Sequence, residues 1–271
     1  MRRRAEGRRL TARIVEVTSA DDPALEPYAH IRERDLRGRE GLFIAESEVV
    51  VRVMIARSRF RVRSLLLERR RVAALEDVLV KLSDSVSVYV VEQAVMDAVT
   101  GFSIHRGVLA LGERADVDAT TLLAAEGPFV ALVGLTNHDN VGGVFRNAGA
   151  FGASAVLLDE ETCDPLYRKA IRVSAGAALV VPFARAASAH ALLDLFAAND
   201  IEAIALTPRG EERIDALPPR RRRALILGTE GRGLPDHVLA RARRVRIDAP
   251  GLDSLNVAVT SGIALYEITR R

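Results

Sequence analysis

Three polar, glycine-containing stretches of the sequence combine the residue types that could carry chemistry. Each follows an apolar run and precedes a helical pattern, at residues 136–148, 227–235 and 247–256. Their polar side chains include an arginine, a carboxylate and several neutral hydrogen-bonding groups: Arg146, Glu230, Asn140, Ser254 and Asn256. Ligands of open α/β sheets bind at the carboxyl ends of the strands, where such stretches fall. We therefore expect the three stretches to meet in one site.

The glycines of the first stretch do not form a familiar phosphate cradle. Gly142 and Gly143 allow close approach of the backbone, but the spacing is not G-x-G-x-x-G and no P-loop lysine follows. A dinucleotide or ATP site is therefore disfavoured. A solvated face would explain a lone arginine, but the setting of Arg146 beside Asn140 favours a functional role. Ser254 stands where a helix N-cap is expected, and capping alone would account for it.

The elements that position these stretches alternate between strands and helices in the second half of the chain. Strands are expected at 129–135, 155–158, 180–183, 204–206, 224–227 and 245–247. Helices are expected at 142–151, 166–172, 189–198 and 235–241, with a C-terminal helix after Ser254. This alternation is typical of βαβ units in a parallel, doubly wound sheet.

The first half of the chain predicts a smaller α/β domain with its own sheet. Strands are expected at 12–17, 42–46, 63–67, 86–91 and 108–111, and helices at 23–33, from 47, at 72–79 and at 93–99. A polar, Ala-rich segment then ends in Gly127-Pro128. We therefore divide the chain into a domain at 1–115, a linker at 116–128 and a domain at 129–271.

Composition excludes several classes of protein. The 271 residues are 49% hydrophobic, yet no apolar run is long enough to span a membrane. The single cysteine, Cys163, excludes an internal disulfide and makes a cysteine-based zinc site unsuitable, so we expect no metal. The basic N-terminus is not followed by a long apolar stretch, which argues against a signal peptide. We expect a soluble, cytoplasmic protein.

Arginine supplies almost all of the positive charge. The net charge is +3, and Lys81 and Lys169 are the only lysines. Arginines cluster in runs at 69–71, 220–223 and 241–246. Each run could be a solvated face, but together they make an anionic polymer a plausible partner.

At this point the sequence resembles a known family, the SpoU (TrmH-like) RNA ribose methyltransferases of the SPOUT superfamily. Three motifs carry the resemblance, in the family's order: Asn140-x-Gly142-x-x-x-Arg146-x-Ala148, Gly228-x-Glu230-Gly231-x-Gly233-Leu234 and Ser254-Leu255-Asn256-Val257. The segment 164–176 is also similar to the family. More weakly, the first domain resembles the L30e-like RNA-binding domain, most clearly in His105-Arg106-Gly107-Val108.

The resemblance implies a fold, a cofactor and a reaction. The implied fold is a C-terminal α/β domain with a deep trefoil knot, and the implied reaction is methyl transfer to a ribose 2′-hydroxyl of RNA. S-adenosylmethionine would bind in the knot, at the positions Thr207, Gly228, Gly231, Ile247 and Leu255. The resemblance further implies a homodimer through the C-terminal domain, with RNA across the subunit interface.

The resemblance also assigns roles to side chains. Arg146 matches the catalytic arginine of the family. Because deprotonating an arginine at neutral pH is costly, we expect Arg146 to bind an RNA phosphate and stabilise developing alkoxide charge, and we leave the base open. Asn140, Glu230, Ser254 and Asn256 would orient it and the ribose. Further RNA contacts are expected at Arg106, Arg168 and Arg172.

Two departures from the family pattern affect the third motif. It opens with Ile247-Asp248-Ala249 rather than I-P-M, and the gap from Gly251 to Ser254 is one residue short. Several interpretations of the substrate stay open: ribosomal RNA is favoured because of the first domain, with transfer RNA second, and a resistance methylase has the same motifs. A non-catalytic RNA-binding or ribosome assembly factor is a further alternative, as is a nucleotide-dependent oxidoreductase, which the missing G-x-G-x-x-G disfavours.

Overall fold

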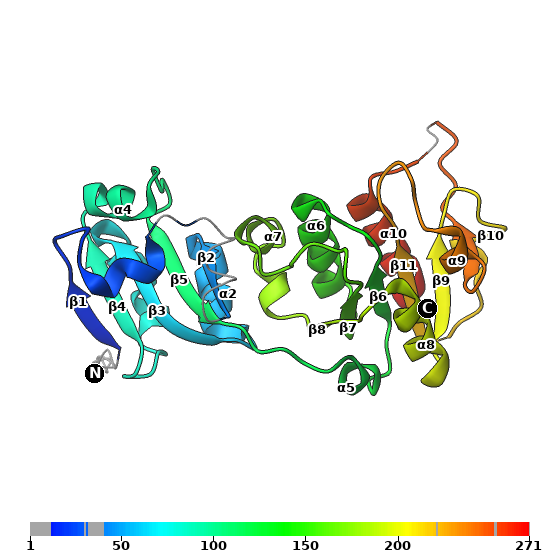
Figure 1. The fold of residues 1–271 in the computed structure, drawn as a ribbon, viewed down its shortest axis with the longest axis horizontal. Helices are drawn as coiled ribbons and strands as arrows, with labels where there is room; N and C mark the ends of the chain where they lie inside the picture. Colours follow the sequence, from blue (N-terminus) through cyan, green and yellow to red (C-terminus); the bar gives the residue numbers. More distant parts are fainter. Residues whose placement is uncertain (1–11, 30, 32–40, 221, 252–253, 271) are drawn as a thin grey trace, which may run out of the picture. The chain divides into compact units, whose positions relative to one another are not determined.

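The computed structural model of the chain describes residues 12–29, 31, 41–220, 222–251 and 254–270. The chain divides into two compact units, residues 1–115 and 116–271 (Figure 1). Each unit has its own sheet and its own apolar core.

The first unit is built on a five-stranded mixed sheet in the order β1-β4-β3-β5-β2. The strands are β1 (Arg13–Glu16), β2 (Leu42–Glu46), β3 (Arg61–Glu68), β4 (Ser87–Val91) and β5 (Val108–Glu113). Strand β5 runs antiparallel to its neighbours β2 and β3, while the other pairs are parallel. The helices are α2 (Glu48–Arg57), α3 (Val72–Leu79) and α4 (Gln93–Thr100), with 3-10 turns η1 (Pro23–Tyr28) and η2 (Arg69–Arg71).

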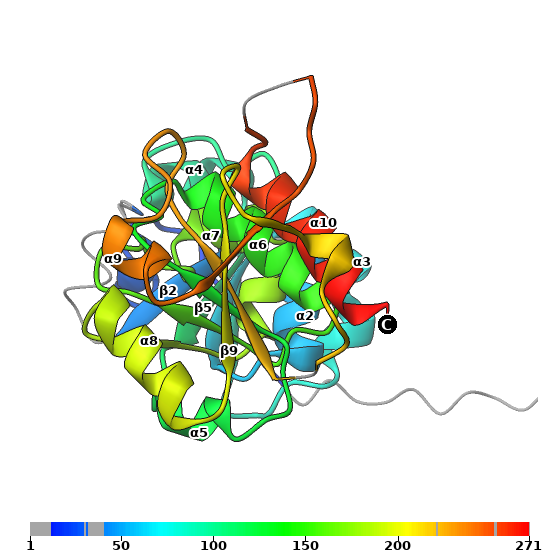
Figure 2. The same cartoon turned by 90° about the vertical axis from the view of Figure 1, so that its right-hand side faces the viewer.

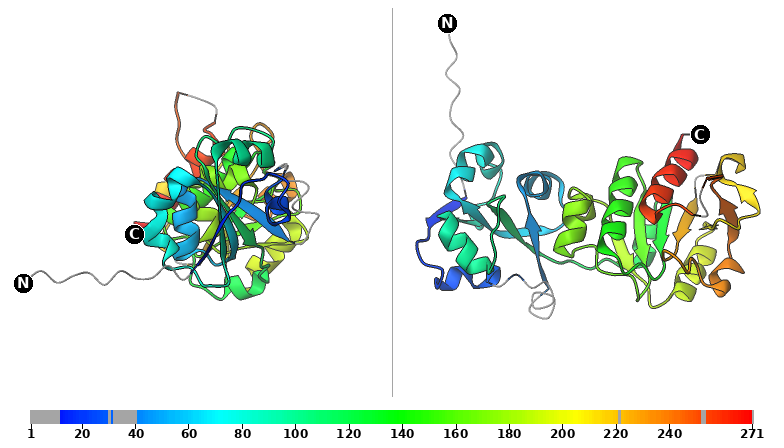
Figure 3. Two further views of the ribbon diagram at one scale, coloured as in Figure 1. Left: turned by 90° about the vertical axis from the view of Figure 1, so that its left-hand side faces the viewer. Right: turned by 90° about the horizontal axis from the view of Figure 1, so that it is seen from above.

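These helices cover both faces of the first sheet. Helices α2 and α3 lie on one face, and α4 with η1 lies on the other (Figure 3, right). The expected helix at 23–33 is instead a 3-10 turn that ends at Tyr28, because Pro27 within it lacks the N–H of a regular helix. Part of that expectation, residues 30 and 32–33, lies outside the described residues.

The second unit holds a seven-stranded sheet in the order β10-β12-β9-β11-β6-β7-β8, and every pair is parallel. Its strands are β6 (Phe129–Leu132), β7 (Ala155–Leu158), β8 (Phe183–Arg185), β9 (Glu202–Leu206), β10 (Glu212–Arg213), β11 (Arg223–Leu227) and β12 (Arg243–Arg246). The expected α/β class with a parallel C-terminal sheet is therefore confirmed. The trefoil knot stays a prediction.

Helices lie on both faces of this sheet (Figure 2). On one face lie α5 (Ala119–Leu123), α8 (Ala189–Ala198) and α9 (Asp236–Leu239), packed on an apolar cluster that includes Phe196 and Ile226. On the other lie α6 (His138–Ala150), α7 (Arg168–Val173) and α10 (Val257–Thr269), with 3-10 turns η3 (Ala177–Leu179) and η4 (Ile214–Ala216) also present in the unit.

Two segments differ from the sequence-based expectation. Residues 116–128 contain α5, which begins at the cap Asp118, and its Leu123 is fully buried in the core of the second unit. The strand expected at 180–183 begins only at Phe183. The residues before Phe183 still follow the turn η3, because the Val181 N–H donates to the Ala177 carbonyl. Pro182 has no N–H with which to bond to a neighbouring strand.

Two adjacent glycines let α6 pack closely between its neighbours. A Cβ atom on Gly142 would lie 2.7 Å from the Ala170 carbonyl oxygen of α7, and one on Gly143 would lie 2.5 Å from the Ala258 Cβ of α10. The side chain of Asn147, one turn further on, donates to the Ala258 carbonyl over 2.6 Å and to the Ser261 hydroxyl over 2.9 Å. Gly142 thus allows α7, and Gly143 allows α10, to pack closely against α6.

Candidate functional site

Asn256 joins all three polar stretches in one place. Its Nδ2 donates to the Asn140 Oδ1 over 2.9 Å and to the Glu230 Oε1 over 2.6 Å. Its Oδ1 accepts from the backbone N–H groups of Ala258 and Val259, at 2.9 and 3.3 Å. Asn256 is therefore both the N-cap of α10 and the bridge between the stretches, because an amide carries both donors and an acceptor.

The expected cap at Ser254 was wrong. Helix α10 begins at Val257, so Ser254 lies two residues before the cap, where it is exposed and lines a cavity. An asparagine oxygen serves as well as a serine oxygen at an N-cap, and the sequence offered both.

Asn140 reaches Asn256 because α6 starts earlier than expected. Asn137 caps α6 through a hydrogen bond from the Asp139 N–H, so the helix begins at His138 instead of Gly142. Asn140 therefore lies in the first turn, where it is 6% exposed. The buried Asp159 braces the preceding loop, since its carboxylate accepts from the Gly134 N–H over 2.9 Å and from Thr162.

Glu230 is held by a tight turn in the second stretch. The Gly233 N–H donates to the Thr229 carbonyl over 3.0 Å, and both Gly231 and Gly233 have positive φ, at 85° and 71°. A Cβ on Gly228 would lie 2.6 Å from the Gly233 carbonyl, so the two ends of the turn are in contact. This closure directs the Glu230 carboxylate toward Asn256.

A cavity of about 780 Å³ opens beside this hydrogen-bonded cluster. The loops after β9, β11 and β12 form its walls, at the carboxyl ends of three neighbouring parallel strands. Its lining includes every residue expected to contact the cofactor: Thr207, Gly228, Gly231, Ile247 and Leu255. Glu230, Ser254 and Asn256 also line it, together with the apolar residues Leu206, Leu227, Val245 and Val257.

Arg146 lies apart from the cluster. It is exposed on α6, does not line the cavity, and forms no side-chain hydrogen bond or ion pair with any residue that the structure describes. Asn140 and Arg146 are six residues apart on one helix, which places them on different faces at 3.6 residues per turn. Arg146 lies four residues after Gly142, which faces α7, and three residues after Gly143, which faces α10, so it is on the exposed part of α6 between these two neighbours.

The three arginines expected to contact RNA have different surroundings. Arg106 is exposed in the loop before β5 of the first unit. Arg168 and Arg172 belong to α7, and both have interaction partners within the chain. Beside them, the rings of His138 and Tyr167 stack with centroids 3.8 Å apart, and Lys169 pairs with Asp139 over 2.6 Å.

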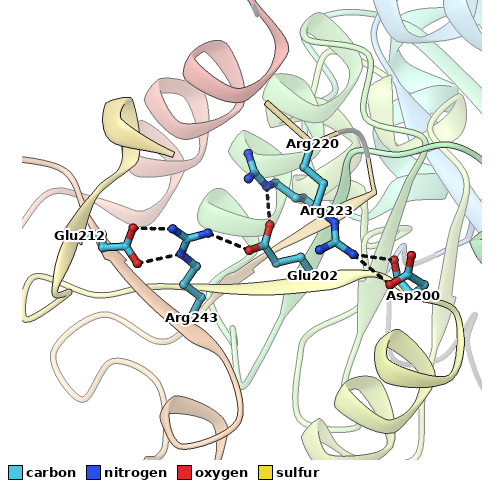
Figure 4. Close-up of polar contacts among 6 residues, drawn as sticks. All are labelled: Asp200, Glu202, Glu212, Arg220, Arg223 and Arg243. Carbon is cyan, nitrogen blue, oxygen red and sulfur yellow. Dashed lines mark hydrogen bonds and ion pairs between the residues drawn. The ribbon is translucent and has the colours of Figure 1, made fainter. Parts of the chain in front are cut away.

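The arginine runs are mostly occupied by ion pairs. Arg243 pairs with Glu202 and Glu212, and Glu202 also accepts from Arg223 over 2.7 Å (Figure 4). Similar pairs engage many of the remaining arginines: Arg69 with Glu16 and Glu92, Arg70 with Glu68, Arg220 with Asp200, Arg241 with Asp194, Arg244 with Glu211, and Arg246 with Asp248. Many arginines of the runs thus form ion pairs within their own unit, which composition did not indicate.

Other kinds of site find no support in the residues described. Within the described ranges, no group of three or more His, Cys, Asp or Glu side chains is placed to hold a metal ion. None of the described helices is long and apolar enough to cross a bilayer.

Comparison with known proteins agrees with this geometry. A model of the SpoU rRNA Methylase family matches residues 127–266. An uncharacterised tRNA/rRNA methyltransferase from Mycobacterium bovis is 38% identical over 270 residues, covering 95% of this chain and 92% of that protein. The AdoMet-bound rRNA methyltransferase from Sinorhizobium meliloti shares the fold, with a TM-score of 0.77, 24% identity and coverage of 95% and 98%. A solved RNA 2′-O ribose methyltransferase gives a TM-score of 0.75 at 26% identity, with coverage of 94% and 98%.

The fold, the cavity at the strand ends and the three joined motifs define an α/β RNA methyltransferase. The chain belongs to the SpoU rRNA methylase family, whose methyl donor is S-adenosylmethionine. The resemblance noted from the motifs is thereby confirmed.

Proposed function

We propose that the protein transfers a methyl group from S-adenosylmethionine to a ribose 2′-hydroxyl of ribosomal RNA, in the cytoplasm. The observation that carries this proposal is the bridge from Asn256 to Asn140 and Glu230 beside the cavity. The RNA 2′-O ribose methyltransferase among the solved structures supports the ribose as acceptor. Transfer RNA is the second candidate, because the relative from M. bovis is named a tRNA/rRNA methyltransferase.

The residues of the cavity suit S-adenosylmethionine. A volume of about 780 Å³ lies within the range of small-molecule sites. Ile247 and Leu255, half-buried in the lining, offer apolar surface for an adenine ring, while Gly228 and Gly231 leave backbone groups accessible to the polar parts of the cofactor. When bound, S-adenosylmethionine supplies a methyl group activated by a positively charged sulfur.

The protein's own side chains then position the ribose. Asn256 is held by Asn140 and Glu230, so the rim of the cavity is preorganised before RNA arrives. Arg146 keeps its proton, binds a phosphate of the RNA and stabilises negative charge that develops on the 2′-oxygen. Ser254, exposed at the rim, contacts the nucleotide.

A homodimer completes the site. Val259, Ile263 and Tyr266 of α10 are 51%, 36% and 51% exposed, and their spacing of four and three residues puts them on one helix face. The ring of Tyr266 meets Phe151 at the end of α6 in an edge-to-face contact. An apolar strip of this kind is typical of a subunit interface. Because Arg146 lies apart from its own cluster and is exposed on α6, the helix that packs beside α10, we assign it to the partner subunit's cavity.

The first unit serves as the RNA-binding domain, with an L30e-like fold. Arg106 lies in the loop before β5, where an exposed guanidinium can bind phosphate. The unit would hold RNA so that the target ribose reaches the second unit. Arg168 and Arg172 of α7 would add contacts near the site.

Methyl transfer tests the proposal directly. The protein is incubated with radiolabelled S-adenosylmethionine and either total ribosomal RNA or total transfer RNA, and the RNA is then digested to nucleosides. A labelled 2′-O-methyl nucleoside from ribosomal RNA is the expected result, and the same product from transfer RNA would favour the second candidate. Label on a base would refute ribose methylation. If the protein binds S-adenosylmethionine but methylates neither pool of RNA, either as free RNA or in assembled ribosomal subunits, the result would favour a non-catalytic RNA-binding factor.

A further inference from the structure

Three arginines of the second unit are exceptions to the general pairing of basic side chains. Most others donate to a carboxylate or to backbone carbonyls, as Arg222 does at Leu123, Ala125 and Asn199. Among the described residues from 116 to 270, Arg146, Arg209 and Arg232 are exposed and their side chains form no hydrogen bond or ion pair. In Arg209 the backbone N–H, and not the side chain, forms a hydrogen bond, which the Thr207 hydroxyl accepts.

Arg209 and Arg232 flank the same cavity from two different loops. Thr207 and Pro208, which directly precede Arg209, line the cavity, and so do Gly231 and Gly233 on either side of Arg232. The loops follow β9 and β11, which are adjacent and parallel, so both arginines stand at one edge of the sheet. The tight turn from Thr229 to Gly233 holds Arg232 at a fixed place on the rim.

The carboxylates beside these arginines are turned toward other partners. Glu230, two residues before Arg232, is bonded to Asn256 at 2.6 Å. Glu211, two residues after Arg209, pairs with Arg244 on β12. The positive charge at the rim is therefore left without compensation from these neighbours. An exposed guanidinium without a partner is suited to bidentate binding of phosphate.

We infer that Arg209 and Arg232 bind the phosphates that flank the target nucleotide where the RNA strand meets the cavity. This inference rests on the proposed function and names a contact of the same site. The two guanidinium groups bind the phosphates of the RNA strand and do not contact its bases, so they raise the affinity for RNA without conferring sequence preference. They hold the ribose at the opening, while Asn256 and Glu230 order the rim.

Variants that remove charge but keep polarity test the inference. Arg209→Gln, Arg232→Gln and the double variant are compared with Arg241→Gln, a control whose arginine is paired with Asp194. Binding of a fluorescent oligouridine and of total ribosomal RNA is titrated at several salt concentrations, and S-adenosylmethionine binding is measured by calorimetry. The double variant should bind RNA at least about tenfold more weakly, and its dependence of log K on log salt should weaken by roughly 0.7 for each phosphate that is no longer neutralised.

Other readouts separate this role from alternatives. The KM for RNA should rise while kcat at saturating RNA and the affinity for S-adenosylmethionine stay unchanged, and the control should change RNA affinity less than about twofold. Replacement of both residues by lysine should keep most of the salt dependence. Unchanged RNA affinity in the double variant would overturn the inference. Weaker cofactor binding with unchanged RNA binding would also overturn it, by assigning the arginines to the carboxylate of S-adenosylmethionine.

Failure of the proposed function gives a different pattern. If the unaltered protein methylates no RNA, the proposed function fails, while the two RNA titrations still decide whether Arg209 and Arg232 bind phosphate. If the unaltered protein methylates RNA and the double variant has the same KM, the function stands and this inference fails.

Discussion

The Nδ2 of Asn256 lies 2.6 Å from the Oε1 of Glu230, although 26 residues separate them along the chain. The same amide caps α10 through its oxygen. One side chain thus sets where the C-terminal helix begins and how the rim of the cavity is ordered. This double role allows the two contributions to be separated by substitution.

Asn256→Ser should separate capping from positioning. A serine hydroxyl still caps α10, but it does not reproduce the two hydrogen bonds from Nδ2. Methyl transfer should fall about 100-fold because the rim loses its order, while thermal unfolding changes little. Asn256→Ala should show the same loss of rate and a further loss of about 1 kcal/mol in stability. Equal stability of the two variants would contradict the capping role.

The apolar strip on α10 should control the oligomeric state. Ile263→Glu places a charge in the middle of the strip, between Val259 and Tyr266. Light scattering should show a dimer for the unaltered protein and a monomer for this variant, because burying the new carboxylate at an interface is costly. Val49→Glu, at a residue 61% exposed in the first unit, should stay a dimer. A dimer in both variants would rule out this face as the interface.

Arg146→Ala should abolish methyl transfer and leave S-adenosylmethionine binding nearly intact. The arginine does not line the cavity, so cofactor affinity should stay within about twofold. If Arg146 serves the partner subunit's cavity, mixing this variant with Asn256→Ala and allowing subunits to exchange should restore part of the activity. A mixture as inactive as its components would place both residues of a working site in one subunit. Unimpaired turnover in Arg146→Ala alone would remove the residue from the site.

The close packing of α6 against α10 should not tolerate a side chain at Gly143. Gly143→Ala puts a Cβ 2.5 Å from that of Ala258, so α10 must shift. Overpacking of this kind costs about 1 to 3 kcal/mol, which urea unfolding would measure. Activity should fall as well, because Asn256 moves with α10. Gly251→Ala is the control, since a Cβ there meets nothing within 4 Å. A stabilised Gly143→Ala variant would show that the helices have room to relax.

The ion pairs around Glu202 should make stability fall in acid. Burial by itself raises the pKa of Glu202, but hydrogen bonds from Arg223 and Arg243 outweigh it and hold the pKa below its ordinary value. The hydrogen bond from Arg243 likewise lowers the pKa of Glu212. Both carboxylates therefore stabilise the fold above the unfolded pKa of about 4.3, and this stabilisation is lost as pH falls through their lower folded values.

Glu202→Gln tests this acid dependence. Arg223 is 3% exposed and would lose its carboxylate partner, so the variant should be less stable at neutral pH by about 3 kcal/mol. Its loss of stability below about pH 4 should also be smaller than that of the unaltered protein. Chemical unfolding at a series of pH values would measure both effects. Parallel curves for the two proteins would show that Glu202 does not contribute to the acid transition.

Much of the second unit could be predicted from local sequence. The buried strands read as continuous apolar runs, and the three polar stretches each follow one, so their meeting at one edge of a parallel sheet was foreseeable. The strand of two residues at Glu212–Arg213 was not, because so short an element has no periodicity. The predicted start of α6 was Gly142, whereas the helix begins at His138 with Asn137 as its cap. The adjacent glycines weaken the helical pattern at its true start.

The partners of charged side chains were beyond the reach of the sequence. Nothing in the run 241–246 indicates that Arg243 faces Glu202 and Glu212, which lie on other strands. The bridge at Asn256 was likewise hidden, since its partners are 26 and 116 residues away. Composition therefore pointed to the arginine runs as nucleic-acid contacts. Among the described residues of the second unit, however, Arg146, Arg209 and Arg232, whose side chains form no hydrogen bond or ion pair, are scattered singly through two loops and α6.

The surface ion pairs also bear on how an enzyme of this kind can acquire a new substrate. Arg244 is engaged by Glu211 on the strand edge next to the cavity loops, and a single change of that glutamate to a neutral residue would release its guanidinium. The substrate range can thus widen through the loss of a negative charge, with no basic residue gained. Evolution toward another RNA would begin among the acidic residues, and a library of acid-to-amide substitutions is where such new specificities should be sought.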